Sequence, residues 1–126
     1  MTKQVLMVED DKVLRRLFRD VLVHYDCKIS EAGSLPEAHQ QLDKQSFDFV
    51  LCDIHLGEET SLEAADRCLR EKIPVIIISS DDAYIKPLKE NGIAAFLVKP
   101  VHIPDLVEIV QNIDNLESFQ TVRYPR

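Results

Sequence analysis

Short apolar runs alternate with longer amphipathic segments along this chain, and no other feature constrains its fold as strongly. The clearest runs are residues 5–8, 49–52, 75–78 and 95–98. Each run is about four residues long and apolar throughout, which is typical of strands that are buried on both faces. Residues 28–30 form a weaker run, which we interpret as an edge strand.

The segments between these runs have helical spacing. The first carries an apolar stripe at steps of three and four, formed by Leu14, Leu17, Phe18, Val21, Leu22 and Tyr25. Ser34 and Glu37 form a capping-box pattern, which predicts the start of a second helix. Further helices are predicted over residues 62–71, over residues 83–91 and from near Pro104 onward.

A strand followed by a helix therefore occurs five times. This alternation predicts an α/β fold in which a parallel sheet has helices on both faces. Five such units fit a doubly wound, five-stranded sheet of order 2-1-3-4-5. We expect one domain over residues 1–117, followed by a polar, aperiodic tail at residues 118–126 that frays.

Charge and cysteine content exclude several classes of function. The 22 acidic residues outnumber the 15 basic ones, and a net charge of −7 disfavours binding to nucleic-acid backbones or to anionic membranes. No apolar run approaches the ~20 residues of a membrane span, and acidic residues follow the N-terminus too early for a signal peptide. Cys27, Cys52 and Cys68 are widely spaced and odd in number, which favours reduced thiols and a cytoplasmic location.

Chemically informative residues follow the predicted strands. In a sheet of this kind, ligands bind at the carboxyl ends of the strands, so these positions indicate the site. The residues in question are Glu9, Asp10 and Asp11 after the first strand, Asp53 after the third, Ser79 and Ser80 after the fourth, and Lys99 and Pro100 after the fifth. We therefore expect these four groups to meet at one edge of the sheet.

The residue types at this edge point to phosphoryl-transfer chemistry. Like charges ~4 Å apart repel by about 1 kcal/mol in water and by more in a protein, so carboxylates crowded together suggest a function or a counter-charge. An incomplete set of oxygen ligands suits Mg²⁺, which keeps several waters and often binds phosphate oxygens. An aspartate nucleophile, a metal, a lysine and a hydroxyl group together form a minimal phosphoryl-transfer site.

Four motifs resemble, in order, those of the receiver domains of two-component response regulators, which have a flavodoxin-like fold. They are LMVEDD at 6–11, LCDIHL at 51–56, PVIIISS at 74–80 and FLVKP at 96–100. The resemblance extends to about Leu116. It implies that Asp53 accepts the phosphoryl group and that Mg²⁺ is held by Glu9, Asp10, Asp53 and the backbone carbonyl of His55. It also implies that Ser79 and Lys99 bind the phosphoryl oxygens, that Phe96 is the switch aromatic, and that the Lys99–Pro100 bond is cis.

Two regions depart from the family pattern. Gly57 stands in the loop after Asp53 where relatives usually have a proline, which predicts a more mobile loop. The segment from Ser79 to Lys99 is about two residues shorter than is typical. It also contains Pro87, which puts the fourth helix in doubt. Taken alone, Phe96 fits a core residue as well as a switch residue.

The resemblance implies a signalling switch rather than an enzyme that turns over a substrate. The expected partners are a sensor histidine kinase or a phosphotransfer protein and an unidentified output, with no membrane and no direct nucleic-acid binding. The cognate kinase, the output pathway, the phosphoryl lifetime and any effector domain after Arg126 stay open. So does the oligomeric state, with a homodimer as one option.

Three alternative functions have weaker support. A phosphatase of the haloacid dehalogenase type also uses an aspartate nucleophile, but it needs a second carboxylate two residues further on, where this chain has His55. A receiver-like module that is not phosphorylated would be expected to lack the acidic pair or Lys99, and both are present. A flavodoxin-type protein needs a phosphate-binding loop after the first strand, where the acidic residues 9–11 would repel the phosphate.

Overall fold

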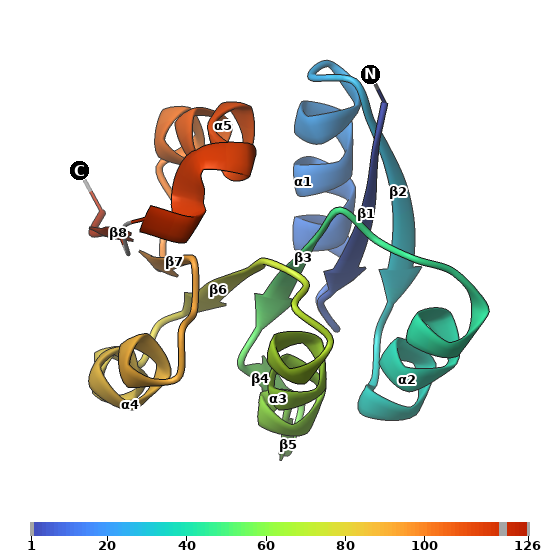
Figure 1. Cartoon of the computed structure of the whole chain (residues 1–126), viewed down its shortest axis with the longest axis horizontal. Helices are drawn as coiled ribbons and strands as arrows, with labels where there is room; N and C mark the ends of the chain where they lie inside the picture. The colour runs from blue at the N-terminus through green and yellow to red at the C-terminus, as the bar shows by residue number, and fades with distance from the viewer. Residues whose placement is uncertain (1, 119–120, 126) are drawn as a thin grey trace.

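The computed structural model describes residues 2–118 and 121–125. They form a parallel sheet with helices on both faces (Figure 1). The sheet has the order β2-β1-β3-β6-β7-β8. Its strands are β1 (Lys3–Val8), β2 (Cys27–Ala32), β3 (Phe49–Asp53), β6 (Val75–Ser79), β7 (Ala95–Val98) and β8 (Thr121–Arg123). The first five positions confirm the predicted order 2-1-3-4-5, in which β6 and β7 are the fourth and fifth predicted strands.

In the described part of the chain, five α-helices cover the sheet in two groups (Figure 1). One face carries α1 (Lys12–Val23) and α5 (Ile103–Gln111). The other carries α2 (Leu35–Lys44), α3 (Leu62–Arg70) and α4 (Ile85–Glu90). Because each interior strand has a helix layer above and below it, both of its faces are apolar, which explains the continuous apolar runs in the sequence.

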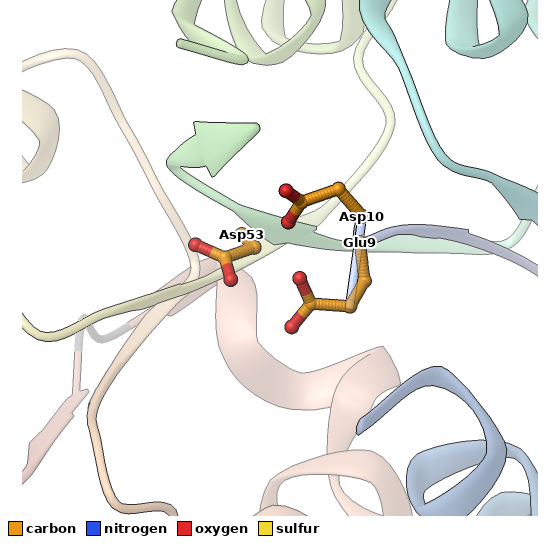
Figure 2. A group of neighbouring side chains, drawn as sticks. All are labelled: Glu9, Asp10 and Asp53. Carbon is orange, nitrogen blue, oxygen red and sulfur yellow. The ribbon is translucent and has the colours of Figure 1, made fainter. Parts of the chain in front are cut away.

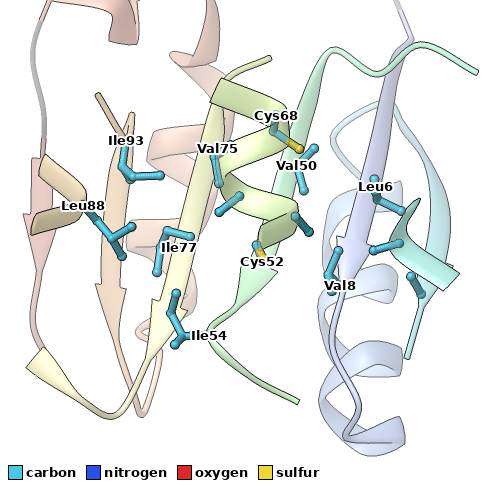
Figure 3. Close-up of a cluster of buried hydrophobic side chains, with 14 of the residues drawn as sticks. Leu6, Val8, Val50, Cys52, Ile54, Cys68, Val75, Ile77, Leu88 and Ile93 are labelled. Carbon is cyan, nitrogen blue, oxygen red and sulfur yellow. The ribbon is translucent and has the colours of Figure 1, made fainter. Parts of the chain in front are cut away.

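Two buried clusters, one on each face, hold these layers together. Figure 3 shows the cluster beneath α2, α3 and α4, where Cys52 and Ile77 of the strands lie with Cys68 of α3 and Leu88 of α4. The opposite cluster joins Phe49 of β3 to Phe18 of α1 and to helix α5. The sheet is thus held rigidly from both sides, which fixes the positions of its strand ends.

The first helix buries a narrower stripe than its sequence pattern predicts. Phe18 and Leu22 are buried, but Leu17 is 45% exposed and Tyr25 is 40% exposed. The helix ends at Val23, so Tyr25 lies beyond it. The prediction was wrong for these two residues. Side chains spaced four residues apart along one line of the helix are enough to pack α1 against the sheet.

The second helix begins where the capping box predicts. The hydroxyl of Ser34 accepts a hydrogen bond from the N–H of Glu37 at 3.3 Å. The Glu37 carboxylate accepts from the N–H of Gly33 at 2.8 Å, one residue earlier than in the usual capping box.

The fourth helical segment is present but short. A 3₁₀ turn, η1 (Asp82–Tyr84), leads directly into the six residues of α4. Pro87 is tolerated because it lies in the first turn of α4, where a backbone N–H would have no helical partner. Gly92 follows the helix with a φ of +94°, which agrees with its predicted role at the helix end.

The loop after Asp53 is a small hairpin. Strand β4 (His55–Leu56) pairs antiparallel with β5 (Glu59–Thr60), and Gly57 makes the turn with a φ of +62°. A proline has its φ fixed near −65° and could not adopt this conformation. Glycine is therefore matched to the shape of this loop, and proline would not be.

The tail differs from the prediction that it frays. After the 3₁₀ helix η2 (Ile113–Ser118), strand β8 pairs in parallel with β7, with Val122 opposite Phe96. The side chain of Arg123 donates a hydrogen bond to Glu108 of α5 at 3.1 Å. Three residues give no readable periodicity, so the sequence pattern could not reveal this strand.

None of the helices in the described part of the chain has the length and apolar character needed to cross a membrane.

Candidate phosphoacceptor and metal site

The predicted site residues lie at the carboxyl edge of the sheet. Glu9 directly follows β1, Asp53 is the last residue of β3, Ser79 is the last residue of β6 and Lys99 directly follows β7. These strands are parallel, and β3 lies between β1 and β6. Asp53 is therefore at the centre of the edge, next to the acidic pair on one side and Ser79 on the other.

Three carboxylates converge at this edge. Figure 2 shows the carboxylates of Glu9 and Asp10 pointing toward the side of Asp53, and oxygens of all three lie within 4.8 Å of each other. Glu9 and Asp53 are buried, whereas Asp10 is exposed to solvent. The group therefore has an open side through which a ligand can enter.

Lys99 provides the opposite charge. Its ammonium lies 2.5 Å from Oδ2 of Asp53 and 3.6 Å from Oε1 of Glu9. Burial lowers the pKa of Lys99, but the hydrogen bond and the attraction to Asp53, together with Glu9, outweigh it and raise the pKa above its ordinary value. Lys99 is thus held as a cation beside the two buried carboxylates.

The proton affinity of Glu9 reflects the crowding. Burial, together with the neighbouring Asp53, raises the pKa of Glu9 from its ordinary value of 4.5 to about 8, against the opposing effect of Lys99. This site therefore disfavours a further negative charge on Glu9 unless more positive charge is supplied.

The donor set fits a magnesium ion. Three carboxylates face a single ammonium group, and Oε1 of Glu9 is buried with no hydrogen-bond partner among the described residues. Mg²⁺ prefers oxygen ligands and is usually held by only a few carboxylates plus water and phosphate. A divalent cation would supply the positive charge that Lys99 alone does not.

Backbone groups of the β4–β5 hairpin hold two of the acids in place. The N–H of His55 donates to Oδ1 of Asp53 at 3.0 Å, so both carboxylate oxygens of Asp53 are engaged. The N–H of Gly57 donates to Oδ2 of Asp10 at 2.8 Å. The second contact links the tip of the hairpin to the acidic pair that follows β1.

Ser79 and Phe96 are the remaining predicted members of the site. The Ser79 hydroxyl is buried and accepts from the N–H of Asp81 at 3.0 Å, which leaves its own proton free to be donated. Phe96 is 1% exposed and packs in the cluster beneath α4, so it is a core residue in this structure, and its role as the switch aromatic stays a prediction. The Lys99–Pro100 peptide bond is cis, as the resemblance implies.

Sequence reasoning did not identify three contributors to this region. Gly57 acts through its backbone N–H, and any residue type carries that group. Ser61 precedes Leu62 and looks like an ordinary helix cap, yet its hydroxyl bonds the Asp53 carbonyl. The ring of Tyr84 meets that of His55 edge-on at 5.8 Å, a contact between segments that are distant in sequence.

Comparisons with known proteins agree with this geometry. Residues 5–111 match the family described as "Response regulator receiver domain". The polar-differentiation response regulator DivK of Brucella ovis is 30% identical over 89% of this chain and 96% of its own length. The transcriptional regulatory protein CrdR of Helicobacter pylori is 27% identical over 98% of this chain, which spans only 62% of that longer protein.

Solved structures with the same fold are also numerous. A putative response regulator from Chloroflexus aurantiacus has a TM-score of 0.80 and 26% identity, over 90% of this chain and 98% of its own. TrrA of Thermotoga maritima, solved with Mg²⁺ and BeF, has a TM-score of 0.79 at 24% identity over 89% of this chain and 99% of its own. The chain therefore belongs to the response regulator receiver domain family of two-component systems.

Proposed function

We propose that this chain is a phosphorylation-driven switch in which Asp53 accepts a phosphoryl group from a sensor histidine kinase or a phosphotransfer protein. One observation carries the proposal. The Asp53 carboxylate is buried at the end of β3, oriented through both oxygens, and enclosed by an ammonium group on one side and an acidic pair on the other. A carboxylate that serves only as a surface ion-pair partner needs none of this surrounding structure.

The transfer requires little from the protein beyond placement and charge. A carboxylate oxygen of Asp53 attacks the phosphorus of a phosphohistidine, a P–O bond forms, the P–N bond breaks, and the leaving imidazole recovers its electron pair. Lys99 is already within reach of Oδ2 and can bind a phosphoryl oxygen. Ser79, with an unused hydroxyl proton at the end of β6, is the second donor.

We assign the Mg²⁺ ligands to Glu9, Asp10 and Asp53, together with the backbone carbonyl of His55. When bound, the ion neutralises negative charge that develops on the transferred phosphoryl group. The solved TrrA neighbour, which contains Mg²⁺ and BeF, supports this assignment by analogy of fold. The chain's own support is the oxygen-rich donor set and the unpartnered oxygen of Glu9.

Receiver domains are signalling switches and not conventional enzymes, and we propose the same here. A phosphatase that uses an aspartate nucleophile needs an acid two residues later, where this chain has His55. We place the chain in the cytoplasm because its three cysteines are free and buried. We propose that the output partner binds the surface around Tyr84 and α5, beneath which Phe96 is buried.

The test is a mass measurement after incubation with acetyl phosphate, with and without Mg²⁺. We expect the parent to gain one phosphoryl group only when Mg²⁺ is present, and Asp53→Ala to gain none. Asp20→Asn, which alters an exposed acid of α1, is the matched control and should label like the parent. Labelling of Asp53→Ala at the parent's level would show that the acceptor has been assigned to the wrong residue.

A further inference from the structure

Ser61 lies at the junction between the hairpin and α3 and is fully buried. It occupies the N-cap position of α3, but its hydroxyl makes no capping hydrogen bond to that helix. Ser34 and Asp11, at the corresponding positions of α2 and α1, both cap their helices through the side chain. The Ser61 hydroxyl must therefore serve another purpose.

That hydroxyl bridges Cys52 and the phosphoacceptor. Sγ of Cys52 lies 3.0 Å from Oγ of Ser61, and Oγ lies 2.5 Å from the backbone carbonyl oxygen of Asp53. A carbonyl can only accept, so Ser61 donates its proton to Asp53. Burial raises the pKa of Cys52 to about 12, so the thiol keeps its proton and is the donor to Ser61. The two hydrogen bonds therefore run from Cys52 to Ser61 and from Ser61 to Asp53.

The backbone of Ser61 fixes the next residue as well. Its N–H donates to the carbonyl of Ile54 at 2.8 Å. One buried residue thus holds two successive carbonyls, those of Asp53 and Ile54. The next carbonyl in the chain, that of His55, is the one assigned above to Mg²⁺, so Ser61 restrains the backbone on both sides of Ile54.

We propose that Ser61 is a positioning residue for the phosphoacceptor site, acting through the Cys52–Ser61–Asp53 hydrogen-bond chain. This inference rests on the proposed function and extends it. Mg²⁺ requires near-ideal octahedral geometry, so small displacements of its ligands weaken binding. The hairpin turns at Gly57, which has little conformational restraint of its own, and Ser61 ties the other end of that hairpin to β3.

The test uses two variants that lack the hydroxyl, Ser61→Ala and Ser61→Gly. Glycine is well tolerated at helix N-caps, so the second variant guards against a folding defect in the first. We expect both to bind Mg²⁺ about 10-fold more weakly than the parent, as is typical when a group that orients a metal ligand is removed. Titration calorimetry with MgCl₂ measures this affinity.

Phosphorylation by acetyl phosphate provides a second readout. At limiting Mg²⁺ we expect the initial rate of phosphorylation of both variants to fall below that of the parent by a similar factor. At saturating Mg²⁺ we expect their rates to return most of the way to the parent's rate. A merely structural role would not produce this dependence on metal concentration. Ser34→Ala is the matched control because it removes a serine hydroxyl from a different helix start, and it should leave both readouts unchanged.

The outcomes separate this inference from the function on which it rests. If the parent is not phosphorylated, the proposed function fails. If the parent is phosphorylated and the folded Ser61 variants match its Mg²⁺ affinity and rate, the positioning role is overturned while the function stands. If neither variant folds, the hydroxyl belongs to the fold and not to the site, which also overturns the inference.

Discussion

The ammonium of Lys99 lies 2.5 Å from Oδ2 of Asp53, across the gap between the ends of two strands that are not neighbours in the sheet. This contact gives the central carboxylate a counter-charge before any ligand binds. Two further acidic residues, Glu9 and Asp10, lie beside Asp53, so one ammonium group does not balance the negative charge that the three can carry. The consequences for stability, pH dependence and signalling can be measured.

Mg²⁺ should stabilise the folded chain. A ligand that binds only the folded state adds about 2.7 kcal/mol at a hundredfold excess over its Kd, so thermal unfolding should shift to higher temperature. Asp10→Asn should reduce repulsion in the metal-free protein while removing most of the shift caused by Mg²⁺. Differential scanning calorimetry with MgCl₂ or EDTA measures both effects.

The control for this measurement is Asp20→Asn, which neutralises an exposed acid away from the site. It should keep the full shift. An identical melting temperature for the parent in saturating Mg²⁺ and in EDTA would contradict a metal site at this edge.

Stability without metal should decline as the pH rises from about 4.5 to about 8. The folded-state pKa of Glu9 is raised above its unfolded value, so its contribution is present in full below pH 4.5 and is lost as the pH passes the folded value. Through this one group, the free energy of unfolding can change by at most about 1.4 kcal/mol per pH unit. Urea unfolding in EDTA at a series of pH values should reveal it.

Glu9→Gln should flatten this part of the profile because glutamine does not titrate. Glu90→Gln, an exposed residue of α4, is the control and should keep the parent's slope. Equal slopes in the parent and in Glu9→Gln between about pH 5 and about pH 8 would mean that Glu9 is not the titrating group.

The ring contact between His55 and Tyr84 should lengthen the life of the acyl phosphate. The rings meet at 74° and join the hairpin to η1, and His55 lies two residues beyond Asp53. Removing one ring opens a route for attacking water. Tyr84→Ala should therefore shorten the half-life several-fold, as followed by loss of the phosphorylated species in mass spectra after acetyl phosphate is removed.

Tyr25→Ala removes an exposed tyrosine far along the chain from the site and serves as the control. Its acyl-phosphate half-life should equal that of the parent. A half-life for Tyr84→Ala that is unchanged or longer would rule out shielding by this pair.

Phosphorylation should alter the edge of the sheet formed by β7 and β8. Phe96 and Val122 are paired across these strands and share the cluster beneath α4. If Ser79 moves toward the phosphoryl group, the packing around the buried Phe96 should change, where full burial of an aromatic side chain is worth about 1–3 kcal/mol. Beryllofluoride with Mg²⁺, a phosphoryl mimic, should change amide exchange at residues 82–106 and 121–123.

Asp53→Asn treated with beryllofluoride is the control for this experiment and should show no change in exchange. Changes confined to the hairpin after Asp53 would contradict the switch at Phe96 while leaving phosphorylation intact.

The apolar runs and the residues that follow them determined the sheet order and the edge that bears Glu9, Asp53, Ser79 and Lys99. These signals are local, because a strand buried on both faces must be apolar throughout and its end is visible in the sequence. Chain order then dictates which strand ends meet, through the handedness and adjacency of strand–helix–strand units. The sequence therefore predicts that the acidic pair and Asp53 lie close together.

Other features were decided only in three dimensions. Strand β8 has three residues and no period, and it forms because β7 offers an open edge. Ser61 looks like a helix cap until the fold places the Asp53 carbonyl within its reach. The burial of Phe96 beneath α4, and the contact of Gly57 with Asp10, also join segments far apart in the chain. Such contacts depend on distances between elements, and those distances are set when the two helix layers pack against the sheet.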